Sequence, residues 1–123
     1  MPDRTLVDCR ILVVEDEYML ADDLTGELEG AGAIVLGPAP DVESALALLA
    51  GEPRIDGAVL DINLSGEPSY PVADELLRRE VPLLFTTGYD QRAIPERYQH
   101  LPRCEKPIRM AFIREVIGQV IHQ

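Results

Sequence analysis

The sequence lacks tryptophan and has few aromatic residues and few cysteines. It contains four tyrosines, two phenylalanines and two cysteines in 123 residues. Cys9 and Cys104 fit no Cys-x-x-Cys spacing, and they fall on separate strands of the fold predicted below, so we expect no disulfide. Free thiols are typical of a reducing compartment, which favours a soluble cytoplasmic protein.

The chain also lacks an excess of basic charge. It has 11 Lys and Arg residues against 22 Asp and Glu residues, for a net charge of -11. A nucleic-acid surface needs a basic patch, and a negative overall field disfavours binding to anionic membranes. No apolar run approaches transmembrane length, and residues 1–10 have no signal-peptide core. We therefore expect neither nucleic acid nor membrane as a partner.

Short apolar runs and periodic apolar positions alternate along the chain. The apolar runs predict strands over residues 10–14, 33–36 and 57–60, a strand that starts at Val81 and one opened by Pro102. Apolar residues at helical spacing predict a helix that ends at Gly30, one capped by Asp41, one from Ser69 to about Glu80, a short one within 88–97 and a last one over 112–121. Gly37-Pro38 is expected to close the second strand, and residues 63–69 to form a polar loop.

This alternation predicts an α/β domain with a doubly wound, five-stranded parallel sheet. Crossovers of this length suit parallel strands, and the expected strand order is the flavodoxin-like 2-1-3-4-5 with helices on both faces. A hydrophobic content of 46% in 123 residues suits one core, so residues 1–123 form a single domain. Because the chain ends with its last helix, we expect no output domain.

Polar residues with phosphoryl chemistry follow four of the predicted strands. They are Glu15-Asp16-Glu17, Asp61, Thr86-Thr87-Gly88 and Lys106, the only lysine in the chain. The carboxyl ends of strands form the ligand crevice of open α/β sheets, so these groups should meet in one place. Asp61 alone is more often a turn residue, but in this company it can be a nucleophile toward phosphorus.

The acidic residues predict a site for Mg²⁺, or for Mn²⁺ or Ca²⁺ in its place. Mg²⁺ prefers oxygen ligands and offsets the repulsion between a carboxylate and a phosphoryl donor. Asp16 and Asp61 are the best direct ligands, Glu15 acts through water, and the carbonyl of Asn63 is the expected main-chain ligand. The alternative is an acidic first turn that complements the dipole of the following helix, which explains Glu17 well and Asp16 in part.

Thr87 and Lys106 are the candidate phosphate contacts. A hydroxyl from Thr87 can donate to a phosphoryl oxygen, with Thr86 as the competing candidate, although a β-branched residue at a strand end is common without any such role. Lys106 offers a cation for the phosphoryl oxygens. A lone lysine is otherwise a solvated surface charge, but this chain uses arginine nearly everywhere else.

Together these motifs resemble the receiver domain of two-component response regulators, over the whole chain. The motifs are Val13 to Glu17, Leu60 to Leu64, Thr87-Gly88 and Lys106-Pro107. The resemblance implies phosphorylation of Asp61 by a histidine kinase or a small phosphodonor. It also implies Mg²⁺ at Glu15, Asp16, Asp61 and the Asn63 carbonyl, phosphate contacts from Thr87 and Lys106, and a cis Lys106-Pro107 bond.

The stretch from Phe85 to Asp90 resembles the Phe-Ala-Thr-Gly-x-Tyr subfamily of single-domain receivers, which is associated with HWE-type histidine kinases. Thr86 replaces the alanine. Ordinary receivers carry a switching aromatic residue three positions before the lysine, where this chain has Arg103. We therefore expect the signal to appear at Tyr89, with the charged head of Arg103 in solvent or beside an acid.

Two classes of function remain open. The favoured one is a phospho-accepting switch that relays phosphate, drains it from a shared kinase or binds a downstream or phosphotransfer protein, and is not an enzyme. The rival is a Mg²⁺-dependent phosphatase or phosphotransferase of the haloacid-dehalogenase type with Asp61 as nucleophile. That type expects a second aspartate two residues later, where this chain has Asn63. A receiver-like binding module without phosphorylation is the third hypothesis.

Overall fold

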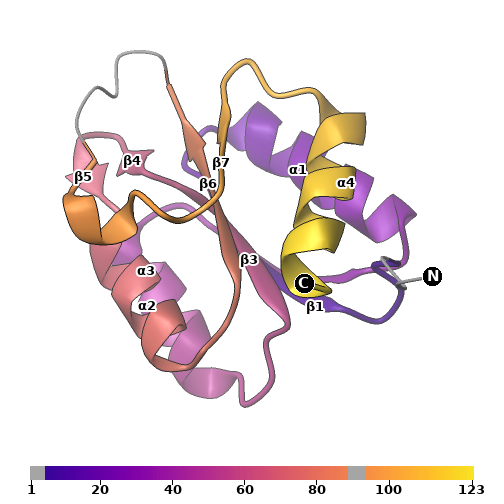
Figure 1. The fold of residues 1–123 in the computed structure, drawn as a ribbon, viewed down its shortest axis with the longest axis horizontal. Coiled ribbons are helices and arrows are strands. Elements are labelled where there is room, and N and C mark those ends of the chain that lie inside the picture. Colours follow the sequence, from indigo (N-terminus) through magenta and orange to yellow (C-terminus); the bar gives the residue numbers. More distant parts are fainter. Residues whose placement is uncertain (1–4, 89–93) are drawn as a thin grey trace.

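The computed structural model describes residues 5–88 and 94–123 and contains a parallel five-stranded sheet. The strand order is β2-β1-β3-β6-β7 (Figure 1), which is the predicted 2-1-3-4-5 once the strands of this sheet are numbered alone. The strands are β1 (Arg10–Val14), β2 (Ile34–Ala39), β3 (Gly57–Asp61), β6 (Leu83–Thr87) and β7 (Arg103–Glu105).

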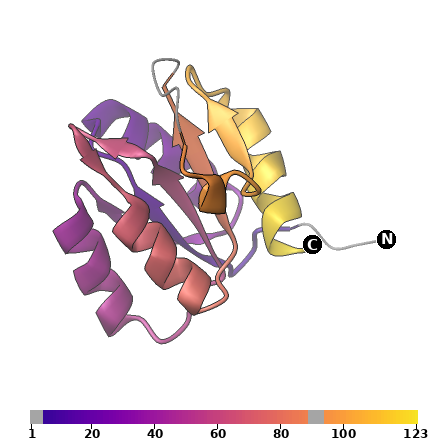
Figure 2. The same cartoon turned by 60° about the vertical axis from the view of Figure 1, so that its left-hand side comes forward.

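Helices cover both faces of this sheet, as predicted. The described residues form α1 (Tyr18–Gly30), α2 (Val42–Gly51), α3 (Tyr70–Arg78), α4 (Met110–Ile121) and the short 3-10 helix η1 (Glu96–Tyr98). Helices α1 and α4 pack together on one face, while α2 and α3 pack together on the other (Figure 1). A second view shows η1 on the side of α3 (Figure 2).

Two apolar layers result, one on each side of the sheet. On the α2/α3 side the core includes Leu12, Leu60, Phe85 and Tyr98, and on the α1/α4 side it includes Ile11, Val59, Leu84 and Ile117. Successive residues of a strand point to opposite faces, so β1, β3 and β6 each feed both layers. Strands that are buried on both faces explain the continuous apolar runs in the sequence.

Three local predictions need correction. Strand β2 does not close at Gly37-Pro38 but continues to Ala39 through a cis bond between those two residues. Residues 63–69 are not an irregular loop, because β4 (Asn63–Leu64) and β5 (Glu67–Pro68) pair as an antiparallel hairpin. Ser69 precedes α3 but its side chain makes no capping hydrogen bond, whereas Asp41 accepts from the backbone N–H of Ser44 at the start of α2 as predicted.

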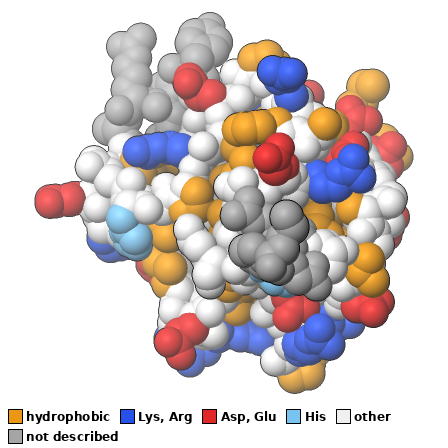
Figure 3. Space-filling model, turned by 45° about the vertical axis from the view of Figure 1, so that its right-hand side comes forward, with side chains coloured by type: hydrophobic (Ala, Val, Ile, Leu, Met, Phe, Trp, Pro, Cys, Tyr) orange, Lys and Arg blue, Asp and Glu red, His pale blue; other side chains and the backbone are white. Residues whose placement is uncertain are grey.

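Charged and apolar side chains are mixed on one face of the molecule (Figure 3). On the side seen in Figure 3, lysine and arginine side chains are scattered among acidic and apolar ones and form no basic patch. No helix within the described residues is both long and apolar enough to cross a bilayer. Cys9 and Cys104 are both buried and form no disulfide with each other, as expected.

Candidate functional site

Asp61 ends β3 and lies almost entirely out of solvent, with 3% of its surface exposed. Its Oδ1 accepts a hydrogen bond from the backbone N–H of Asn63 at 3.1 Å. Its Oδ2 accepts one from Nζ of Lys106 at 2.7 Å. Buried carboxylates are typically paired and hydrogen-bonded in this way, because a buried polar group without partners is costly.

Glu15 is the second buried acid of the site, and 2% of it is exposed. Its Oε2 accepts from the backbone N–H of Glu17 at 3.0 Å, and Nζ of Lys106 lies 3.4 Å from its Oε1. Burial raises the pKa of Glu15 to about 7, the negative charge of Asp61 adds to this, and the Glu17 N–H and Lys106 counteract it in part. The pocket therefore has an excess of negative charge that Lys106 alone does not neutralise.

Lys106 connects the two buried acids. Burial alone lowers the pKa of its ammonium, but the hydrogen bond and charge of Asp61, together with Glu15, outweigh burial and raise this pKa above its usual value. The backbone N–H of Lys106 also donates to the carbonyl of Thr87 at 2.8 Å. The structure thus brings Lys106 and Thr87 together, and the Lys106-Pro107 bond is cis as predicted.

Asp16 completes a group of three carboxylates. Ligand atoms of Glu15, Asp16 and Asp61 all lie within 4.8 Å of one another. Oε1 of Glu15 is buried and makes no hydrogen bond, although the ammonium of Lys106 lies 3.4 Å away. Oxygen donors with an unsatisfied buried member fit a hard divalent cation such as Mg²⁺, so this acidic cluster resembles a receiver metal site.

The structure supports the remaining predicted site residues to different extents. Thr87 and Thr86 are both buried, and Oγ1 of Thr86 has no hydrogen-bond partner. The side chain of Asn63 accepts from the backbone N–H of Gly66 at 2.7 Å, and a metal-ligand role for its carbonyl stays a prediction. Tyr89, the predicted switch residue, lies outside the described residues.

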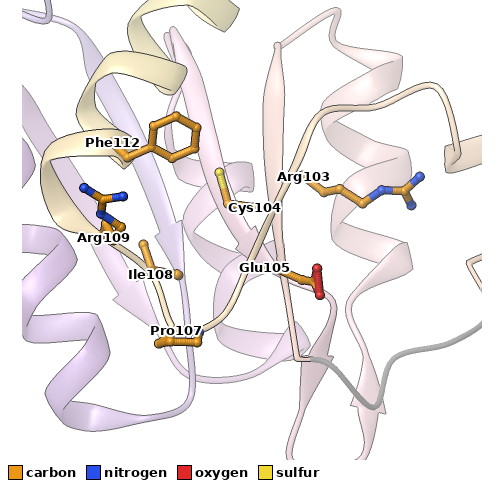
Figure 4. A pocket seen from close by; sticks show the side chains of 7 residues that line it. All are labelled: Arg103, Cys104, Glu105, Pro107, Ile108, Arg109 and Phe112. Carbon is orange, nitrogen blue, oxygen red and sulfur yellow. The ribbon is translucent and has the colours of Figure 1, made fainter.

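Arg103 is exposed, which confirms the expectation that its charged head avoids burial. Figure 4 shows the side chains of Arg103 and Cys104 on opposite sides of β7. Cys104 faces a pocket of about 310 Å³ between β7 and the start of α4, which Ile108 and Phe112 also line. The position usually held by a switching aromatic residue is thus a solvent-facing cation on an edge strand.

Two side-chain contacts were not predicted from the sequence. Ser65 donates a hydrogen bond from its hydroxyl to Oδ2 of Asp16. Tyr98 is fully buried, and its hydroxyl donates to Oδ1 of Asp74 at 2.5 Å. The Ser65-Gly66 pair was a recognisable turn signal within the segment treated as a loop, but nothing in the sequence pointed to the pairing of Tyr98 with Asp74.

Comparison with known proteins identifies relatives in signalling. The solution structure of SdrG from Sphingomonas melonis is 34% identical, covers 90% of this chain and 95% of SdrG, and superposes with a TM-score of 0.77. The phyllosphere-induced regulator PhyR of Methylorubrum extorquens is 35% identical over 115 residues, which is 90% of this chain and 43% of PhyR. The sensory transduction protein LytT of Bacillus cereus is 36% identical over 88 residues, or 69% of this chain and 35% of LytT.

The chain therefore spans less than half the length of PhyR and LytT, and nearly all of SdrG. No family model matches the sequence. A receiver protein from Sinorhizobium medicae shares the fold with a TM-score of 0.73 at 24% identity. The match to SdrG over nearly its full length, the strand order of the sheet and the acidic site at the carboxyl ends of the strands all point to one family. The chain belongs to the receiver-domain response regulators of two-component signalling systems.

Proposed function

We propose that this receiver is phosphorylated on Asp61 by a sensor histidine kinase in a Mg²⁺-dependent reaction, and that the phosphorylated form carries the signal. The observation that carries the proposal is the environment of Asp61. This buried carboxylate follows a parallel strand, lies 2.7 Å from a lysine ammonium and shares its pocket with two further acids. A structural aspartate needs a partner, but it does not need two more carboxylates beside it.

The transfer reaction needs little covalent chemistry from the protein. An oxygen of Asp61 attacks the phosphorus of a phosphohistidine, an oxygen–phosphorus bond forms and the nitrogen–phosphorus bond breaks. The imidazole leaves with the electron pair of that bond and takes up a proton. The main contributions of the chain are then to position the nucleophile and to stabilise charge on the phosphoryl oxygens.

Lys106 and Thr87 are suited to that second task. Lys106 now contacts the oxygen of Asp61, and its ammonium has only to move onto a phosphoryl oxygen once the acyl phosphate forms. The backbone contact from Lys106 to Thr87 keeps the two side chains beside the same place. When bound at Glu15, Asp16 and Asp61, Mg²⁺ would offset the repulsion between donor and acceptor anions.

The surface beside Lys106 suits the approach of a protein donor. An open depression of about 680 Å³ reaches Lys106 and is lined in part by Glu17, Met19 and Gly88. Tyr18 and Met19, at the start of α1, expose 82% and 73% of their surfaces. Exposed large apolar residues next to a reactive site are typical of a protein-binding surface. This proposal extends to an HWE-type kinase, to a downstream or phosphotransfer protein as partner, and to a cytoplasmic location.

Intact mass spectrometry after incubation with acetyl phosphate tests the proposal. The wild-type chain should gain the mass of one phosphoryl group with Mg²⁺ and should lose most of that gain with EDTA. Asp61→Asn should abolish the gain, whereas Asp22→Asn, which changes an exposed aspartate on α1, should leave it intact. Labelling of the Asp61→Asn variant would refute the assignment, and repeated turnover of a phosphomonoester would favour the phosphatase class instead.

A further inference from the structure

The turn of the β4–β5 hairpin brings a hydroxyl to the acidic cluster. Ser65 and Gly66 are the two residues between the paired strands, with φ values of 53° and 91°. Positive φ at both central positions is the type I′ geometry, which favours asparagine, aspartate and glycine at these positions. Serine is not a preferred residue for the first position, so turn chemistry alone does not explain Ser65.

The hairpin that presents Ser65 is held at several points. Leu64 is buried in the α2/α3 layer with 3% of its surface exposed, and the side chain of Asn63 accepts from the backbone N–H of Gly66 at 2.7 Å. At the base, the backbone N–H of Ser69 donates to the carbonyl of Ile62 at 2.8 Å. Ser65 is therefore presented by a fixed turn and not by an irregular loop.

The hydroxyl of Ser65 has one partner, Oδ2 of Asp16. Asp16 is only partly buried, so without a partner its carboxylate could rotate into solvent, away from the repulsion of Glu15 and Asp61. The bond leaves Oδ1 of Asp16 without a hydrogen bond to the described residues. A carboxylate held by one oxygen and open at the other is pre-organised for a metal ion.

We propose that Ser65 is a positioning residue for the metal site, which orients Asp16 toward a divalent cation through its hydroxyl. This inference rests on the proposed metal site and adds a residue that does not itself contact the ion. Groups that hold metal ligands by hydrogen bonds typically change metal affinity about 10- to 100-fold when they are removed. Because Ser65 is exposed, we expect an effect near the lower end, about tenfold.

Ser65→Gly is the sharpest variant, because glycine adopts a positive φ without steric cost and lacks the hydroxymethyl group that contacts Asp16. If Ser65 matters solely for the turn, glycine should leave Mg²⁺ affinity unchanged. We expect instead that affinity for Mg²⁺ alone, measured by isothermal titration calorimetry, falls about tenfold while the thermal midpoint without the ion stays the same or rises. Ser44→Gly, which removes another exposed hydroxyl bonded to an aspartate, at the start of α2, is the matched control for ion affinity.

The outcomes separate this inference from the proposed function. Equal Mg²⁺ affinity in wild type and Ser65→Gly overturns the role of Ser65 and leaves the metal site standing. Absence of Mg²⁺ binding by the wild type overturns the metal site and the role of Ser65 together. Weaker binding by Ser65→Gly with unchanged binding by Ser44→Gly supports the proposal, and an equal loss in both variants overturns it.

Discussion

The two apolar layers on either side of the sheet are built from different kinds of side chain. Among the described residues, the layer beneath α2 and α3 contains Tyr70, Phe85 and Tyr98, while the layer beneath α1 and α4 contains aliphatic residues, the two cysteines and Met110. Both layers are buried, but only the first combines large rings with hydroxyl groups. The aromatic layer can thus make directional contacts that the aliphatic layer cannot.

The rings of the aromatic layer form one connected set. Tyr98 stacks on Tyr70 with centroids 4.6 Å apart and an interplanar angle of 9°, and it meets Phe85 edge-on at 6.1 Å and 88°. The hydroxyl of Tyr98 also contacts Asp74 on α3 and a guanidinium nitrogen of Arg97, each at 2.5 Å. The segment around η1 is therefore fixed to α3 and β6 by a few large contacts.

The proposed phosphorylation site draws on both layers. Asp61 lies two residues after Val59 and shares its face of β3, the aliphatic side. Thr87 lies two residues after Phe85 and shares its face of β6, the aromatic side. The proposed acceptor thus stands over one layer and the candidate phosphate contact over the other, so a pull on Thr87 would act on the aromatic layer first.

The largest expected effect comes from removing the central ring of the aromatic layer. Tyr98→Ala deletes a fully buried ring, so the free energy of unfolding should fall by about 3–5 kcal/mol. Because that ring fixes η1, hydrogen exchange at residues 95–101 should accelerate more than exchange at α1. Urea unfolding followed by circular dichroism, together with exchange read by mass spectrometry, measures both effects.

Ile117→Ala is the matched test of the aliphatic layer. Ile117 is also fully buried, and its truncation should lower the free energy of unfolding by about 2–5 kcal/mol. Exchange at residues 95–101 should then change no more than exchange elsewhere. If both variants accelerated exchange at residues 95–101 equally, the two layers would not differ in how they fix η1.

The fold was predictable because both layers leave a strong pattern in the sequence. Apolar runs such as Ile11 to Val14 predicted the strands, and the alternation of strands and helices predicted the sheet order, which is confirmed. The stripe of α4 predicted the face that Ile113 and Ile117 bury, but Phe112, which was assigned to that stripe, is exposed. The grouping of the candidate site residues was predictable for a related reason, since parallel strands bring their carboxyl ends together and four of these ends carry polar residues. That argument needs only the order of elements along the chain.

Contacts between the side chains of distant residues left no such pattern. The bond from Ser65 to Asp16 joins residues 49 apart, and the bond from Tyr98 to Asp74 joins residues 24 apart. Each depends on a turn geometry or a ring orientation that tertiary packing decides. The hairpin at 63–68 was missed because two-residue strands are too short to show alternation.

Metal binding should produce the next largest change in the free energy of unfolding, through the carboxylates beside Asp61. The carboxylates repel in the absence of an ion, so Mg²⁺ at about 100 times its Kd should raise the free energy of unfolding by about 2.7 kcal/mol. Asp16→Ala should remove most of this gain in urea titrations with Mg²⁺ and with EDTA. An undiminished gain in Asp16→Ala would place the ion elsewhere on the molecule.

The smallest expected effect separates the rings of the aromatic layer from their hydroxyl groups. Tyr98→Phe keeps the stacking but removes the bonds to Asp74 and Arg97, and Asp74 remains partly solvated, so the loss should be about 1 kcal/mol. Tyr70→Phe is the control, because the Tyr70 hydroxyl makes no hydrogen bond to the described residues, and it should change stability by less. Urea unfolding of both variants decides the matter. Equal, negligible losses would mean that the aromatic layer fixes η1 through its rings alone, and the directional contribution of the Tyr98 hydroxyl would have to be abandoned.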